Sequence, residues 1–99
     1  MGIDLLASAE RELLEETGIT AQNWTPLLEM HLSNSVTDEY AVAYLAEGLS
    51  FGESQPEETE QLHVRKLPFR EVVDMVLRGD ITDSLSMVAI LKVNEMLRR

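Results

Sequence analysis

Cysteine is absent from this sequence, so disulfide bonds, thiolate catalysis and zinc sites built on thiolates are excluded. Basic residues are scarce, with 8 Lys and Arg against 18 Asp and Glu, and the formal net charge is −10. Such an acidic chain repels a nucleic-acid backbone and an anionic membrane surface. We therefore expect no nucleic-acid partner and no membrane partner, and a phosphate substrate only with cations in between.

Long hydrophobic runs are missing as well. No apolar segment is long enough to span a bilayer, and the N-terminus has no basic region followed by an apolar one. We therefore expect a soluble cytoplasmic protein. The 99 residues are expected to form a single domain, residues 1–99, with a thin core. A chain of this size buries only about 60 to 70% of its unfolded surface.

The hydrophobic pattern predicts an α+β fold with three helices and three strands. Apolar residues recur at helical spacing from about Asp4 to Thr17, and Gly18 follows where a left-handed cap is expected. Strands are expected at about 24–32, 40–45 and 61–67. A second helix is expected to begin at Pro68 and to end by Gly79. A third helix is expected to follow a cap at Thr82 or Asp83.

The last expected helix is apolar around more than one face, which is typical of a helix enclosed on several sides. We expect part of that surface to be a subunit interface. The histidines, His31 and His63, fall in expected strands without a neighbouring nucleophile and are interpreted as ordinary strand residues. Trp24 is interpreted as a core residue rather than a binding platform.

A group of glutamates stands near the end of the first expected helix. Glu12 precedes Glu15 and Glu16 by three and four residues, so the three side chains project from one helical face. Their repulsion, and the negative end of the helix dipole, each cost roughly 0.2 to 1 kcal/mol. A bound divalent cation such as Mg²⁺, which takes oxygen ligands, makes the close spacing of the carboxylates favourable instead. From spacing alone, a metal site and a solvated acidic face both remain open, and Arg11 can pair with one of these carboxylates.

The string R-E-L-L-E-E-T-G-I at residues 11–19 resembles the second half of the Nudix box, R-E-U-x-E-E-x-G-U, where U is aliphatic. Similarity to the ADP-ribose pyrophosphatase branch of the Nudix hydrolase superfamily continues downstream. It includes T-D-E-Y-A-V-A-Y-L-A at 37–46, P-E-E-T-E-Q-L-H-V at 56–64 and R-G-D-I-T-D-S-L-S at 78–86. The resemblance therefore covers nearly the whole chain.

The resemblance implies roles for the residues of the helix. In such enzymes the helix carboxylates bind Mg²⁺ or Mn²⁺, so Glu12 and Glu16 would be the principal metal ligands and Glu15 an additional one. Arg11 would hold the cluster in place. Gly18 would likewise support the site structurally, at the end of the helix.

The resemblance also implies a substrate and further acidic residues. The substrate class is a nucleoside diphosphate linked to another moiety, and water attacks a phosphorus atom of its pyrophosphate. Glu58 or Glu60 would serve as a further ligand or as the catalytic base. Glu39 matches an acidic position on the substrate side.

The chain departs from the full Nudix box upstream of Arg11. Counting back through the motif puts Ile3 where a glutamate belongs, and the leading glycine falls before Met1. We therefore expect an N-terminally truncated domain that begins inside the Nudix box, with an incomplete α/β/α fold. Missing strands expose backbone edges and apolar faces, so we expect a homodimer, with or without exchanged elements, that covers them.

Two functions remain open from the sequence. The first is a metal-dependent hydrolase of ADP-ribose-like compounds, whose activity the truncation impairs because part of the site and of the substrate pocket is missing. The second is a non-catalytic oligomerisation or binding module that keeps the fold fragment. A third arrangement is a fragment completed by another polypeptide.

Overall fold

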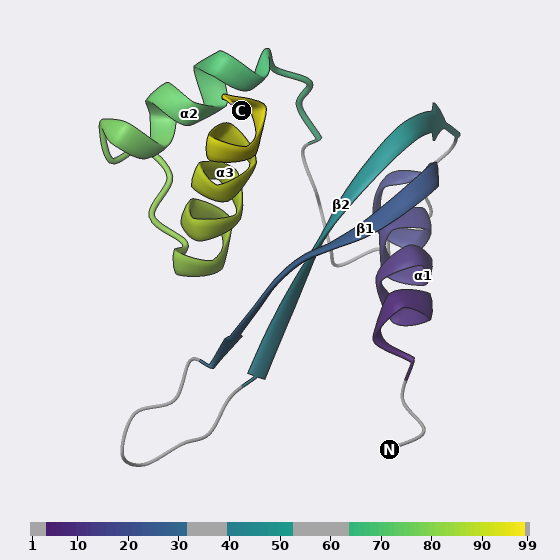
Figure 1. The fold of residues 1–99 in the computed structure, drawn as a ribbon. Coiled ribbons are helices and arrows are strands. Elements are labelled where there is room, and N and C mark those ends of the chain that lie inside the picture. The colour runs from purple at the N-terminus through teal and green to yellow at the C-terminus, as the bar shows by residue number, and fades with distance from the viewer. Residues whose placement is uncertain (1–3, 32–39, 53–63, 99) are drawn as a thin grey trace. The chain divides into compact units, whose positions relative to one another are not determined.

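The computed structural model describes residues 4–31, 40–52 and 64–98 of the chain. These residues form three helices and two strands (Figure 1), which confirms an α+β fold. In chain order the elements are α1 (Leu5–Thr17), β1 (Ile19–His31), β2 (Tyr40–Phe51), α2 (Phe69–Leu77) and α3 (Ser84–Leu97).

The chain divides into two compact units. The first contains α1, residues 19–26 of β1 and residues 44–51 of β2. The second contains the remaining parts of both strands together with α2 and α3. The expectation of one domain stays a prediction.

Helix α1 begins and ends as its sequence predicts. Asp4 caps the first turn, and its Oδ1 accepts a hydrogen bond from the Ala7 N–H at 3.0 Å. Gly18 follows the last helical residue in the left-handed conformation, with φ 74°, and donates its N–H to the Leu14 carbonyl at 2.8 Å. That conformation suits glycine, which has no Cβ to clash.

Strands β1 and β2 pair in an antiparallel hairpin (Figure 1) and are longer than predicted at the end that adjoins α1. Two hydrogen bonds explain the extension. The Ile19 N–H donates to Thr17 Oγ1 at 3.1 Å, and the Gly52 N–H donates to the Gly18 carbonyl at 2.7 Å. Both strands therefore continue to the end of the helix.

The second half of β1 alternates apolar and polar residues in the sequence, and the burial of its side chains follows this alternation. Leu28 and Met30 are half-buried, whereas Glu29 and His31 are exposed. This is the pattern of a strand with one covered face. His31 is an ordinary strand residue, and its ring centroid lies 5.3 Å from that of Tyr40 on the paired strand.

The third predicted strand is wrong at residues 64–67, the part of it that the structure describes. Residues 64–67 are irregular, and residues 61–63 lie outside the described part of the chain. A strand needs a neighbour for its backbone hydrogen bonds, and the one sheet in the described residues contains only β1 and β2. The side chain of Val64 is accordingly 57% exposed.

Helix α2 packs against α3 through the predicted apolar face (Figure 1). Val73 and Val76 are buried, and with Leu27 they are the buried hydrophobic residues described in the second unit. The thin core expected from the chain length is therefore confirmed for the described residues. Leu77, the last residue of α2, is 68% exposed although its neighbour Val76 is buried.

Asp83, and not Thr82, caps helix α3. Its Oδ2 accepts hydrogen bonds from the Ser86 hydroxyl at 2.7 Å and from the Ser86 N–H at 2.9 Å. These bonds favour the charged carboxylate and hold the pKa of Asp83 below its ordinary value. Because the pKa is lowered on folding, the contribution of this cap is present above the unfolded pKa and is lost as the pH falls through the folded one.

No α3 residue is buried within the described residues, so the enclosure of this helix, with part of its surface in a subunit interface, stays a prediction. Lys92 donates from its Nζ to the Leu27 carbonyl of β1, in the same unit. Apolar side chains are nevertheless exposed along the helix at Val88, Leu91, Met96 and Leu97. No helix in residues 4–31, 40–52 and 64–98 is long and apolar enough to cross a membrane.

Candidate functional site

The three glutamates expected to bind metal all lie on α1 and are exposed to solvent. Glu12 and Glu16 are one helical turn apart, so their carboxylates project from the same face. The helix ends one residue after Glu16, at Thr17. The carboxylates are therefore accessible to a bound ion or substrate near the C-terminal end of α1.

Arg11 pairs with Glu15, as the sequence allowed for one of the carboxylates. Arg11 Nε lies 3.9 Å from Glu15 Oε1, one turn along the helix. Both side chains are more than half exposed, and ion pairs of this kind contribute about 0 to 1 kcal/mol. The pair is a weak restraint on Glu15 and leaves Glu12 and Glu16 as the remaining carboxylates of the group. The role of Arg11 in holding the whole cluster stays a prediction.

The donor chemistry of this helix fits a hard cation. Mg²⁺ is usually bound by one or two carboxylates together with substrate phosphates, and Glu12 and Glu16 offer two. Across residues 4–31, 40–52 and 64–98, no three His, Asp or Glu side chains gather closely enough to hold one metal ion. A cation on α1 would therefore take its other ligands from water, from substrate or from residues beyond those described.

The end of α1 is tied to the end of the hairpin. The Gly18 carbonyl accepts the Gly52 N–H at 2.7 Å, two residues beyond Glu16. Gly52 is followed directly by the acidic segment that contains Glu58 and Glu60. The chain therefore enters the acidic segment beside the end of the glutamate helix. Gly18, predicted to support the site, provides both the helix cap and this connection.

Several predicted site residues lie outside the described residues. They are Glu39 on the predicted substrate side, the candidate catalytic residues Glu58 and Glu60, and Ile3 at the glutamate position of the motif. Their roles stay predictions. His63 also lies outside the described residues.

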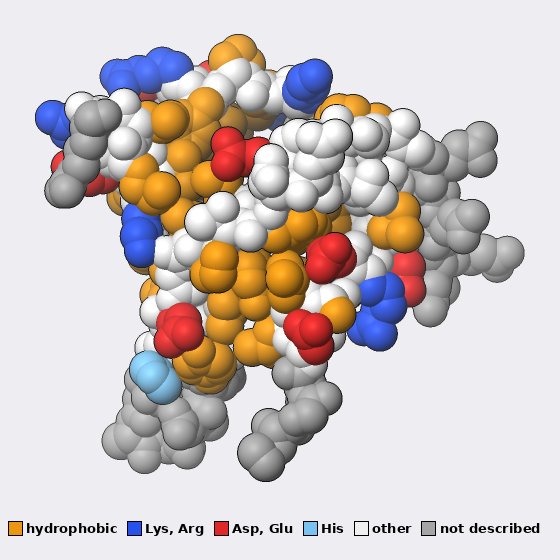
Figure 2. Space-filling view, turned by 45° about the vertical axis from the view of Figure 1, so that its right-hand side comes forward, with side chains coloured by type: hydrophobic (Ala, Val, Ile, Leu, Met, Phe, Trp, Pro, Cys, Tyr) orange, Lys and Arg blue, Asp and Glu red, His pale blue; other side chains and the backbone are white. Residues whose placement is uncertain are grey.

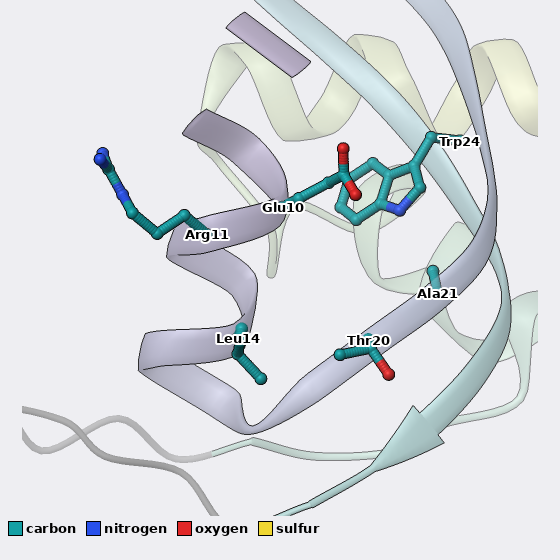
Figure 3. Close-up of a pocket in the computed structure, with 6 residues that line it drawn as sticks. All are labelled: Glu10, Arg11, Leu14, Thr20, Ala21 and Trp24. Carbon is teal, nitrogen blue, oxygen red and sulfur yellow. The ribbon is translucent and has the colours of Figure 1, made fainter. Parts of the chain in front are cut away.

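A cavity of about 250 Å³ lies between α1 and β1 in the first unit (Figure 3). Its lining residues were not predicted as a group from the sequence. They are Glu10, Arg11, Leu14, Thr20, Ala21 and Trp24. Trp24, interpreted from the sequence as a core residue, is half-buried and forms part of the wall. The one available signal was that the chain holds a single tryptophan close in sequence to the glutamate helix.

Comparison with known proteins identifies a similar protein. An ADP-ribose pyrophosphatase of Mycobacterium tuberculosis is 33% identical over 90 residues, which cover 88% of this chain and 43% of that protein. The chain thus spans less than half the length of this relative. No family model matches the chain. The similarity supports a distant, Nudix-like relationship, in agreement with the resemblance of residues 11–19.

Proposed function

We propose that this chain carries the metal-binding helix of a Nudix-type hydrolase that acts on a nucleoside diphosphate linked to another moiety, such as ADP-ribose. The observation that carries the proposal is the connection at the end of α1. Exposed Glu12 and Glu16 lie one turn apart, and the hydrogen bond between Gly52 and Gly18 starts the acidic segment beside them. The proposal adds that Glu58 and Glu60 of that segment act on the same substrate as the helix carboxylates.

The chemistry assigned to the site divides between the ion and the chain. A bound Mg²⁺ or Mn²⁺ ion would neutralise charge on the pyrophosphate and would lower the pKa of a bound water molecule. Glu12 and Glu16 hold the cation, because carboxylate oxygens are its preferred ligands. Glu15 is an additional ligand, restrained by its pairing with Arg11.

Three carboxylates from outside the described residues complete the proposed site, namely Glu39, Glu58 and Glu60. Glu58 or Glu60 accepts the proton of the attacking water or adds a ligand. Glu39 contacts the substrate. These assignments follow the resemblance to the Nudix hydrolases, in which a base and a substrate contact act together with the metal ligands.

Release of AMP from ADP-ribose in the presence of Mg²⁺ tests the proposal. We expect turnover by the native chain and a loss of more than about 100-fold in Glu16→Gln, which keeps the size of the side chain but removes its charge. Glu29→Gln is the matched control, because Glu29 is exposed on β1 outside the proposed site. Equal turnover in native protein and Glu16→Gln would refute the assignment.

The exposed apolar side chains of α2 and α3 favour a second function, that of an oligomerisation module. Figure 2 shows hydrophobic side chains at the surface among the charged ones. Leu77 and Leu97 are each 68% exposed, and Val88 and Leu91 are exposed on successive turns of α3. Apolar surface of this kind commonly marks a protein interface. We propose that a second copy of the chain covers it, with or without exchanged elements. A dimer that releases no AMP would identify this module as the function.

A further inference from the structure

None of the proposed metal ligands lines the cavity between α1 and β1. Neither Glu12 nor Glu16 lines it, and its walls come from one turn of α1 and the first residues of β1. The lining is mostly apolar and the cavity is partly open to solvent. Its volume of about 250 Å³ lies just below the usual range of about 300 to 1,000 Å³ for small-molecule sites. It can therefore accept a ligand no larger than a single substituted ring.

Trp24 contributes an aromatic wall to this cavity. The Tyr44 ring of β2 meets the indole edge to face, with centroids 6.3 Å apart and ring planes at 74°. The indole Nε1 is buried, without a hydrogen-bond partner in the part of the chain that the structure describes, so a ligand in the cavity meets the ring and not this N–H.

The charged side chains around the cavity are arranged unequally. In Figure 3, Glu10 and the indole of Trp24 both extend into the space between α1 and β1, whereas the Arg11 guanidinium points away from it. Arg11 is also the residue that pairs with Glu15. The charge presented to a ligand is therefore negative, as it is for the chain as a whole, whose net charge is −10.

A carboxylate beside an aromatic face is a favourable environment for an organic cation. The carboxylate attracts the positive charge directly, and the indole attracts it through its π face. Leu14 and Ala21 supply apolar wall for the body of the ligand. We propose that this cavity binds a small organic cation, consisting of one apolar ring with an ammonium group.

The roles of the cavity residues follow from this placement. Glu10 pairs with the ammonium group. The ring packs between Leu14 and Trp24. A carboxylate on the same ring would instead meet Glu10 with like charge, so the site discriminates by charge and not by apolar shape alone.

Tyramine provides a suitable probe, because it joins a phenol ring to an ammonium group through a short chain. Trp24 is the only tryptophan, so its indole N–H gives a single indole signal in proton–nitrogen correlation NMR spectra. We expect tyramine to shift this signal saturably, with a dissociation constant of about 1 mM for so few ligand atoms. Hydroxyphenylpropionate, which carries a carboxylate in place of the ammonium group, should produce no saturable shift.

Two matched variants separate the role of Glu10 from general charge. Glu10→Gln should weaken tyramine binding roughly twofold to fivefold, the range of an exposed ion pair. Glu47→Gln, which removes an exposed carboxylate of β2 in the same unit, should leave it unchanged. The proposal is overturned if tyramine gives no saturable shift, if the carboxylate probe binds equally well, or if the two variants behave alike.

Discussion

Gly48 adopts a backbone conformation with φ 71° within β2, where its backbone lies against Gln22 of β1. A Cβ added at Gly48 would stand 3.0 Å from the Gln22 Cβ and 3.1 Å from its Oε1. Such a contact is tighter than nine in ten real Cβ contacts, so Gln22 would have to shift. Both the conformation and the contact therefore require glycine at this position of the hairpin.

Gly48→Ala is expected to lower the free energy of unfolding by about 1 to 3 kcal/mol, from left-handed backbone strain together with crowding against Gln22. Urea denaturation of both proteins measures the change. Gly79→Ala is the matched control, because Gly79 has φ 89° but nothing within 4 Å of an added Cβ. A Gly48→Ala protein that is no less stable than Gly79→Ala would contradict this account of the strand.

Individual residues were predictable from the sequence where their partners are close in the chain. Asp4 and Gly18 were assigned to the two ends of α1 because caps act within one turn. The sequence predicted that Arg11 can pair with one of the nearby glutamates, and in the structure its partner is Glu15. The cavity was not foreseen, since Glu10 and Trp24 belong to different elements and come together only when α1 and β1 fold.

At the scale of elements, the helices were predicted more accurately than the strands. A helix satisfies its own backbone, so the periodicity near Val73 and the cap at Asp83 were sufficient signals. Strand ends depend on distant partners. The hydrogen bond from Gly52 to Gly18 extends the hairpin, and no local pattern announces it. The predicted strand at 64–67 failed for the same reason, because an extended apolar pattern does not provide a pairing neighbour.

Helix α3 carries the prediction about association. Val88 and Leu91 lie three residues apart on one face and are exposed. Introducing a charge at Leu91 should oppose burial of that face in a dimer. We expect light scattering of the native chain at micromolar concentration to give twice the chain mass of 11.2 kDa. Leu91→Glu should weaken the dimer roughly tenfold or more.

Thr82→Glu is the control for the association experiment, because it adds the same charge at an exposed position before α3. It should leave the dimer intact. A native chain that is folded and monomeric at micromolar concentration would refute the proposed dimer. So would equal dissociation of the two variants.

At the scale of the whole molecule, the proposed function depends on residues that are far apart in sequence. The motif at 11–19 predicted the helix carboxylates, and the structure places Glu12 and Glu16 on its exposed face. The sequence alone did not show that the end of the hairpin meets the end of α1. The contact between Gly18 and Gly52 brings them together, and the acidic segment follows Gly52 in the sequence.

Cation binding by α1 is the central claim, and calorimetric titration with Mg²⁺ alone tests it most directly. We expect saturable binding to the native chain and at least about tenfold weaker binding to Glu16→Gln, since a charged ligand is lost. Glu29→Gln should bind as the native chain does. Absence of binding to a folded native chain, or equal binding by Glu16→Gln, would contradict the claim and leave the glutamates of α1 as a solvated acidic face.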